Sequence, residues 1–179
     1  SYRLVGSEMC IRDRSSTVSF RDAPKDKAFF YVWNTLLTHE SRIWERSNKP
    51  LTVNPKDVEI PSYFPDIPEV RNDIARKYSN IEAMDEKVGE IISQLEEDGL
   101  LENTIIMFWS DHGGNLLRQK RAVGNSGLNV PLIIRYPNKI DAGTVDDRIV
   151  SLMDLGPTVL SLLNIEPPKH YDGKAIAGQ

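Results

Sequence analysis

The sequence predicts an α/β domain with a mostly parallel sheet flanked by helices, and three features carry this prediction. Residues 104–109 are apolar or β-branched without alternation, which is typical of a strand buried on both faces of such a sheet. A long amphipathic helix pattern over residues 74–95 leads directly into that run. Apolar runs at residues 28–37 and 130–136 supply two further candidate strands.

The composition is that of a globular chain long enough to bury a core. The 179 residues are 40% hydrophobic and 27% charged, and no apolar run approaches the ~20 residues that a membrane span needs. The formal net charge of -4 gives no general attraction to nucleic acid or anionic lipid, so we expect neither as a partner. The single cysteine, Cys10, excludes an internal disulfide and a thiolate zinc cluster.

Residues 1–14 differ from the rest of the chain. They show neither helical nor strand periodicity and do not lead into the sequence that follows. They resemble the translated sequencing-adaptor read-through found at the ends of metagenomic gene predictions. We therefore expect 1–14 to be a non-native segment and 15–179 to be a partial catalytic domain.

The run at residues 28–37 is followed by Thr38, His39 and Glu40, so a histidine comes just after a predicted strand. Such a histidine is either a structural hydrogen-bonding residue or a catalytic one, and the pattern leaves both open. Residues 41–69 then show no period and contain repeated prolines. A structureless connection of this length is unusual in a compact domain and tends to shape a site.

The helix pattern has apolar residues at spacings of three and four between charged ones, and Gly99 supplies its C-terminal stop. Asp85 lies on the apolar side of this helix. We expect it to be a buried, hydrogen-bonded residue with a structural role.

Asp111 and His112 follow the strand at residues 104–109 almost at once, and Gly113 and Gly114 let the backbone turn sharply. In open α/β sheets, ligands gather at the carboxyl ends of the strands. A carboxylate and an imidazole at such an end form half of a plausible metal site. Alternatively, Asp111 caps a following helix and His112 is an ordinary polar loop residue.

Three cations, Arg118, Lys120 and Arg121, stand together after this turn. They either hold an anion or form a solvated surface run. Beyond the strand at residues 130–136, we expect a short strand at 148–152. Asp154 is the predicted N-cap of a final short helix that ends at Asn164.

Six landmarks in a fixed order resemble the type I sulfatases of the alkaline phosphatase superfamily, and the resemblance covers residues 28–173. The landmarks are residues 38–40, 60–66, 85–89, 110–114, 130–134 and 154–158. The resemblance implies an alkaline-phosphatase-like sheet flanked by helices and truncated at its N-terminal side.

The resemblance also implies roles for the strand-end residues. Asp111 and His112 match the second pair of calcium ligands in the family, although calcium prefers oxygen ligands to a ring nitrogen. Lys120 precedes the proline of the next strand by eleven residues, much as the sulfate-contacting lysine of the family does. Arg118 and Arg121 are the other candidates for binding the substrate anion.

His39 matches the family histidine that contacts the scissile oxygen, where a proton donor assists departure of the alcohol or amine. A proline commonly found two positions after that histidine is replaced by Ser41. The nucleophile of the family is a formylglycine made from Cys or Ser in a Cys-x-Pro-x-Arg motif. We find neither this motif nor the other acidic pair of the metal site. The segment that starts at Cys10 does not match the motif, because Arg12 stands where proline is needed.

These observations predict the C-terminal part of a sulfatase catalytic domain that is inactive by itself. The intact enzyme is expected to use one divalent metal ion, Ca²⁺, and to hydrolyse sulfate esters or sulfamates of small molecules or glycans. Family habit suggests a periplasmic or secreted protein. The alternatives are a phosphatase, phosphodiesterase or phosphonate hydrolase of the same superfamily, and a non-catalytic relic.

Overall fold

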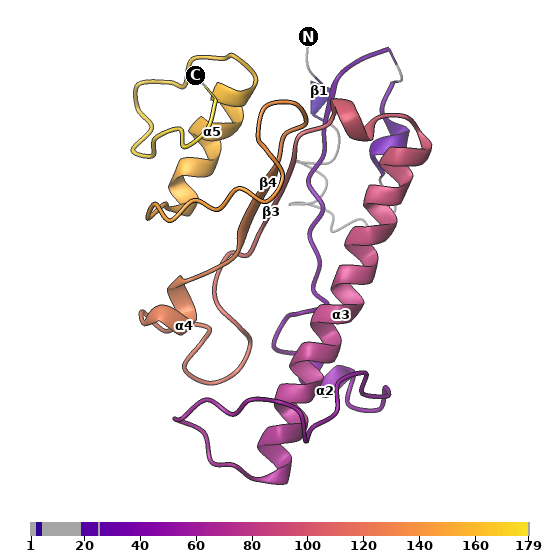
Figure 1. Cartoon of the computed structure of the whole chain (residues 1–179), viewed down its shortest axis with the longest axis vertical. Coiled ribbons are helices and arrows are strands. Elements are labelled where there is room, and N and C mark those ends of the chain that lie inside the picture. Colours follow the sequence, from indigo (N-terminus) through magenta and orange to yellow (C-terminus); the bar gives the residue numbers. More distant parts are fainter. Residues whose placement is uncertain (1–2, 5–18, 25, 179) are drawn as a thin grey trace. The chain divides into compact units, whose positions relative to one another are not determined.

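A computed structural model describes residues 3–4, 19–24 and 26–178 (Figure 1). The chain divides into two compact units, and each is described by itself. Unit 1 comprises Ser1–Gln94 with Gly114–Leu117, and unit 2 comprises Leu95–Gly113 with Arg118–Gln179.

Two short strands pair in unit 1. They are β1 (Arg3–Leu4) and β2 (Phe29–Phe30), which run parallel to each other. The strand predicted over residues 28–37 is therefore much shorter than expected. Apart from β1, the segment 1–14 lies outside the described residues, so its non-native origin stays a prediction.

Helix α3 (Pro68–Glu97) is the longest element. In Figure 1 the loop segments of unit 1 run alongside it. It begins on a proline, whose missing N–H costs nothing in the first turn. Two residues after its last residue, Gly99 adopts a left-handed φ of 67° and turns the chain away from the helix axis. The Leu100 N–H then donates to the Leu95 carbonyl at 2.8 Å. The predicted helix and its glycine stop are confirmed.

The prediction for Asp85 is wrong, because this residue is exposed. The fully buried positions of α3 cluster in its first half, at Ile74, Ala75, Arg76, Ser79 and Asn80, and the next one is Leu95. The apolar period identified Ile74 and Leu95 as buried, but Tyr78 of the same predicted face is 41% exposed and the polar residues Ser79 and Asn80 are buried instead.

Unit 1 has its apolar core where the long loop packs on α3. Val58 from the loop lies against Ile74 and Ala75 of the helix, and partly buried side chains surround them: Leu51, Val53, Ile60, Val70 and Leu116. The loop begins with the short helix α2 (Arg42–Glu45) and otherwise contains only turns and bends, so the predicted absence of regular structure holds for residues 46–67.

The loop backbone is satisfied mainly by side chains of α3. The buried guanidinium of Arg76 donates to the carbonyls of Ser47, Lys49 and Pro50. The Ser79 hydroxyl accepts the N–H groups of residues 52 and 53 at 3.1 and 3.2 Å. Because an unpaired buried backbone group is costly, these donors and acceptors fix the course of the loop.

Arg71 holds the second half of the same loop. Its guanidinium donates to the carbonyls of residues 55, 56 and 58 and forms an ion pair with Asp66 at 2.5 Å. The hydrogen bond from Arg71 lowers the pKa of the Asp66 carboxyl, so this carboxylate stays charged to a lower pH than an isolated aspartate.

Unit 2 contains the strand that leads into the predicted site. A 3-10 turn, η2 (Leu101–Asn103), connects α3 to β3 (Ile106–Trp109), which pairs with β4 (Leu132–Arg135). The pairing is antiparallel, with Ile106 opposite Arg135 and Trp109 opposite Leu132. Both strands confirm predicted elements and, with the helices, confirm the α/β class.

The predicted burial of β3 on both faces is wrong. Its residues are only half-buried and Trp109 is 41% exposed, while Ile133 of the neighbouring strand is 61% exposed. In the part of the chain that the structure describes, this sheet has two strands, so no further strand covers its edges.

The strand expected at residues 148–152 does not form, whereas the expected final short helix does. A 3-10 turn, η3 (Leu152–Asp154), leads into α5 (Leu155–Leu162). Asp154 lies at the N-cap position of α5, as predicted, but its carboxylate accepts the N–H groups of Lys174 and Ser151, each at 2.8 Å, rather than an N–H of α5. These bonds, led by that from Lys174, lower the pKa of Asp154.

Two short helical elements complete the described structure: η1 (Phe20–Asp22) in unit 1 and α4 (Asn125–Leu128) in unit 2. Among the described residues, no helix combines the length and the apolar character needed to cross a membrane.

Replacement of Arg76 by alanine should lower the free energy of unfolding by about 2 kcal/mol, because buried loop carbonyls lose their charged donor. Urea unfolding of the full chain, followed by circular dichroism, measures this change. Asn72→Ala alters an exposed residue of the same helix and is the matched control. An unchanged midpoint for Arg76→Ala would contradict the anchoring role of this arginine.

Candidate functional site

The turn after β3 carries the predicted metal pair. The Ser110 hydroxyl donates to the His112 carbonyl at 2.7 Å and closes the turn. The Nδ1 atom of His112 lies 2.7 Å from the Gly113 carbonyl oxygen. Because a carbonyl only accepts, Nδ1 carries a proton, and in the neutral ring Nε2 then keeps its lone pair.

The Nε2 atom lies near the neighbouring carboxylate. His112 Nε2 lies 3.7 Å from Asp111 Oδ1, and the side chains are 36% and 83% exposed. With metal–ligand distances of about 2.0 to 2.6 Å, both atoms can reach one cation. A histidine that donates its other ring nitrogen to a backbone carbonyl is a common arrangement for a metal ligand.

The pair by itself is too small to be a metal site. Within the described ranges, no group of three or more His, Cys, Asp or Glu side chains could hold a metal ion. The alternative role of Asp111 as a helix cap is wrong, because the next helix, α4, has Gly124 at its N-cap.

Two glycines hold the Asp111–His112 turn against the segment that follows. The Gly113 N–H donates to the Gly127 carbonyl at 2.9 Å. A Cβ atom on Gly113 would lie 1.9 Å from the Ser126 carbonyl oxygen, and one on Gly127 would lie 2.0 Å from that of Ala122. Direct backbone contact therefore requires glycine at both positions.

The basic segment 118–121 lies in the same unit and has an unusual backbone. Arg118 and Arg121 adopt left-handed φ values of 62° and 65°. Each such residue without glycine costs about 1 kcal/mol, and such conformations cluster at functional sites. The Ser126 hydroxyl donates to the Arg118 carbonyl, and the Ala122 N–H donates to the Gln119 carbonyl at 3.2 Å, so further bonds stabilise the segment.

The three cations differ in exposure. Arg118 and Arg121 are exposed, as a surface run would be, whereas Lys120 is half-buried between them. Lys120 is therefore the least exposed residue of the three.

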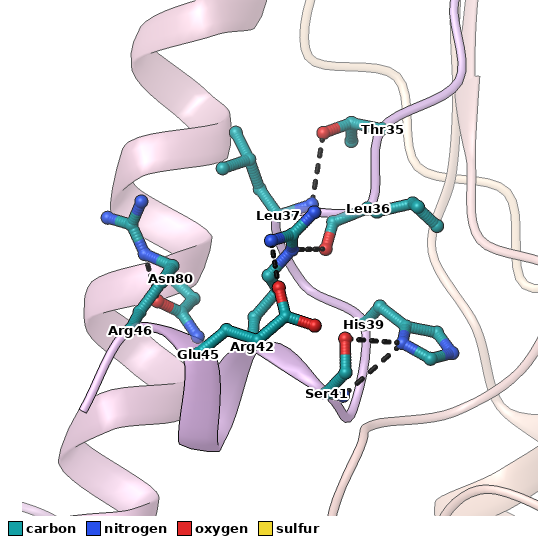
Figure 2. A network of polar contacts seen from close by, with 9 residues as sticks. All are labelled: Thr35, Leu36, Leu37, His39, Ser41, Arg42, Glu45, Arg46 and Asn80. Atoms are coloured by element: carbon teal, nitrogen blue, oxygen red, sulfur yellow. Dashed lines mark hydrogen bonds and ion pairs between the residues drawn. The ribbon is translucent and has the colours of Figure 1, made fainter. Parts of the chain in front are cut away.

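His39 lies in unit 1, in a turn fixed from several directions (Figure 2). Its N–H donates to the Leu36 carbonyl at 3.0 Å, and its carbonyl accepts the Arg42 N–H at 2.9 Å. Its Nδ1 accepts the N–H of Ser41 at 3.2 Å and lies 3.2 Å from the hydroxyl of the same serine.

Asn115 is a residue that sequence reasoning missed. Its side-chain amide donates to the Thr38 carbonyl at 3.0 Å, and both residues belong to unit 1. The peptide bond before His39 is thereby tied to a residue that follows the Gly113-Gly114 turn in the chain. A polar residue directly after that glycine pair was the available signal, but its partner is 77 positions away.

The predicted residues thus fall into two groups. Unit 2 holds the metal pair and the basic segment, joined through the contact between Gly113 and Gly127. Unit 1 holds His39 with Ser41 and Asn115.

An α/β chain with these strand-end residues has the architecture of the alkaline-phosphatase-like hydrolases. A family model described as Sulfatase matches residues 12–165, which is well over half of the chain. The chain therefore belongs to the sulfatase family.

Similar proteins agree with this assignment. The ulvan-active sulfatase of Formosa agariphila is 49% identical over 152 residues, which cover 83% of this chain and 25% of that protein. Human N-sulphoglucosamine sulphohydrolase is 32% identical over 122 residues, covering 68% of this chain and 24% of the relative. The chain thus spans about a quarter of the length of these curated relatives.

A solved structure supports the fold. It comes from work on the metabolism of multiple glycosaminoglycans by Bacteroides thetaiotaomicron and superposes with a TM-score of 0.60 at 23% identity. The match covers 85% of this chain and 34% of that structure.

Replacement of Gly113 by alanine should destabilise unit 2 by about 2 to 3 kcal/mol, because the new methyl group overlaps the Ser126 carbonyl. Urea unfolding measures the loss. Gly124→Ala is the matched control, since a Cβ there meets nothing within 4 Å and its φ of -87° suits alanine. Equal stability of the two variants would refute the close backbone contact.

Proposed function

We propose that this chain is part of a sulfuric ester hydrolase that, in the intact enzyme, cleaves sulfate esters or sulfamates of glycans. The observation that carries the proposal is the sulfatase family match over a chain whose strand-end turn is fixed against a basic segment. The names of the relatives, ulvan-active sulfatase and N-sulphoglucosamine sulphohydrolase, favour a sugar substrate.

Lys120 is proposed to bind the sulfate group. Lys120 is half-buried, and a cation in a partly buried side chain can interact with an anion more strongly than a fully exposed one, because less water screens the charge. Such a cation can neutralise the sulfate oxygens and the charge that develops on the leaving oxygen. Arg118 and Arg121, which are exposed, are assigned to the outer part of an anionic substrate.

His39 is proposed to assist departure of the alcohol or amine from sulfur. The fixed turn keeps the imidazole in one orientation, which is what a group acting on a single substrate atom requires.

Asp111 and His112 are proposed as two ligands of a divalent metal, with Ca²⁺ as the expected ion. The exposed carboxylate and the ring nitrogen facing it fit such a role, and the remaining ligands would come from outside this chain. When bound, the cation supplies positive charge that polarises the sulfate group.

The nucleophile is expected upstream of the described domain as a formylglycine. This chain by itself is therefore expected to lack sulfatase turnover, since a lysine, a histidine and half a metal site do not replace a nucleophile. A periplasmic or secreted location is likewise proposed for the intact enzyme.

The rival functions differ in the missing upstream region. A phosphatase, phosphodiesterase or phosphonate hydrolase would carry Thr or Ser there as nucleophile, and no comparison favours this class. A non-catalytic relic would lack the acidic pair and the nucleophile. Sequencing the source locus upstream of Ser15 discriminates among them, and we expect an acidic pair followed by Cys or Ser in an x-Pro-x-Arg context.

The protein encoded by the extended reading frame should hydrolyse an aryl sulfate in preference to an aryl phosphate. Lys120→Ala should lower kcat/KM by about 100-fold, because the charge developing in the transition state loses its counterion. Lys139→Ala removes an equal charge from an exposed position and is the control. A preference for phosphate, or equal activity of the two variants, would refute the proposal.

Calcium should raise the Tm of the same extended protein, because a ligand that binds only the folded state stabilises it. Asp111→Ala should abolish most of this shift, whereas Asp147→Ala, which removes an exposed acid of unit 2, should preserve it. A wild-type protein that does not respond to calcium would support the relic instead.

A further inference from the structure

The contact between Ser41 and His39 defines which ring nitrogen carries the proton. The donor is the backbone N–H of Ser41, 3.2 Å from Nδ1 of His39. A backbone N–H can only donate, so Nδ1 must offer its lone pair. A neutral imidazole whose Nδ1 accepts has its proton on Nε2.

Local structure makes this N–H available. Ser41 precedes α2, and its carbonyl accepts the Glu45 N–H at 3.0 Å, while its own N–H belongs to the first turn, where no helix carbonyl is in reach. The side chain of His39, two residues earlier, accepts this N–H instead. A proline here would lack the donor, so the contact depends on the residue that departs from the family pattern.

The surrounding turn holds Ser41 and His39 in fixed positions relative to each other. Arg42 donates through Nε to the Leu36 carbonyl at 3.3 Å and pairs with Glu45 (Figure 2). The end of α2 is tied to α3, because Arg46 Nε donates to the Asn80 side chain at 2.8 Å. Asn80 is fully buried, so this anchor has little freedom to move.

We infer that Ser41 is a positioning residue whose backbone N–H fixes Nδ1 of His39 as an acceptor, so that the neutral form of the ring carries its proton on Nε2. The inference deepens the proposed function, on which it rests, by specifying how His39 assists the leaving group. His39 donates a hydrogen bond to the leaving oxygen and keeps its proton, because complete transfer from a ring with an unprotonated Nδ1 would produce an imidazolate. The nucleophile expected upstream forms its bond to sulfur as the S–O bond of the ester breaks, and the electron pair of that bond moves to the leaving oxygen. The hydrogen bond from Nε2 stabilises the developing charge, and water supplies the proton that converts the leaving oxygen to an alcohol.

Nuclear magnetic resonance of the full chain tests the assignment. The chain has three histidines, so the ring nitrogens of His39 are readily resolved and assigned. In the wild-type protein at a pH where the rings are neutral, we expect the His39 proton on Nε2. We also expect a scalar coupling across the hydrogen bond between the Ser41 amide nitrogen and Nδ1.

Two substitutions separate the backbone donor from the hydroxyl. Ser41→Ala keeps the N–H and should preserve the proton on Nε2 and the coupling. Ser41→Pro removes the N–H, and the φ of -61° at this position suits the proline ring. In that variant the Nδ1 resonance should move to the position of an unbonded acceptor. His112, whose Nδ1 donates to a carbonyl, should show the opposite tautomer in all three proteins and is the internal control.

Amide hydrogen exchange provides a readout that needs no proline. The Ser41 amide should exchange about tenfold faster in His39→Ala than in the wild-type protein, because its acceptor is lost. A merely structural role for Ser41 at the start of α2 would leave both the His39 nitrogens and this exchange rate unchanged.

The assignment is overturned by a wild-type His39 that is protonated on Nδ1, or by an exchange rate that His39→Ala leaves unaltered. Loss of the coupling in Ser41→Ala would overturn it as well, because the hydroxyl would then be the specifying group. None of these readouts involves turnover. If the extended protein has no sulfatase activity, the proposed function fails. The hydrogen bond between Ser41 and His39 is still tested by the nuclear magnetic resonance spectra.

Discussion

The structure of unit 1 depends on how a long loop without regular structure satisfies its backbone. Residues 46–67 have no neighbouring strand to bond with, so their carbonyls need donors from elsewhere. Helix α3 supplies them by placing Arg71, Arg76 and Ser79 against the loop. This explains why polar side chains occupy much of the buried face of the helix. The same face holds α2 through Asn80, and α2 begins beside His39.

In unit 2, a segment without regular structure is held by backbone contacts rather than by side chains. The turn that carries Asp111 and His112 is held by a hydrogen bond between two glycines, and the contact distance leaves no room for a Cβ. Nearby, two arginines accept left-handed backbone conformations. The close backbone contact and the left-handed residues thus lie near Asp111, His112 and Lys120, the residues proposed to act in catalysis. Backbone strain in folded proteins tends to cluster at such functional sites.

The sequence predicted those features that local pattern determines. The 3.6-residue period identified α3, and Gly99 marked its end because a left-handed residue was needed there. Patterns did not reveal which surfaces are covered, so the burial of Asp85 and of β3 was predicted wrongly. In the site, the strand end and glycine turn singled out Asp111 and His112 as candidates, and their role as metal ligands stays a prediction. The contact from Asn115 to Thr38 joins positions 77 residues apart, and no single-sequence pattern encodes it.

Two histidines that look alike in the sequence are given opposite chemistry by their backbone neighbours. Each follows an apolar run, and each uses Nδ1 to contact a main-chain group. His39 meets an N–H and must accept, whereas His112 meets a carbonyl and must donate. In the neutral rings, Nε2 is therefore a hydrogen-bond donor in the first and a lone pair in the second. A donor suits a group that acts on a leaving oxygen, and a lone pair suits a metal ligand. The local turn, rather than the residue type, thus separates the two proposed roles.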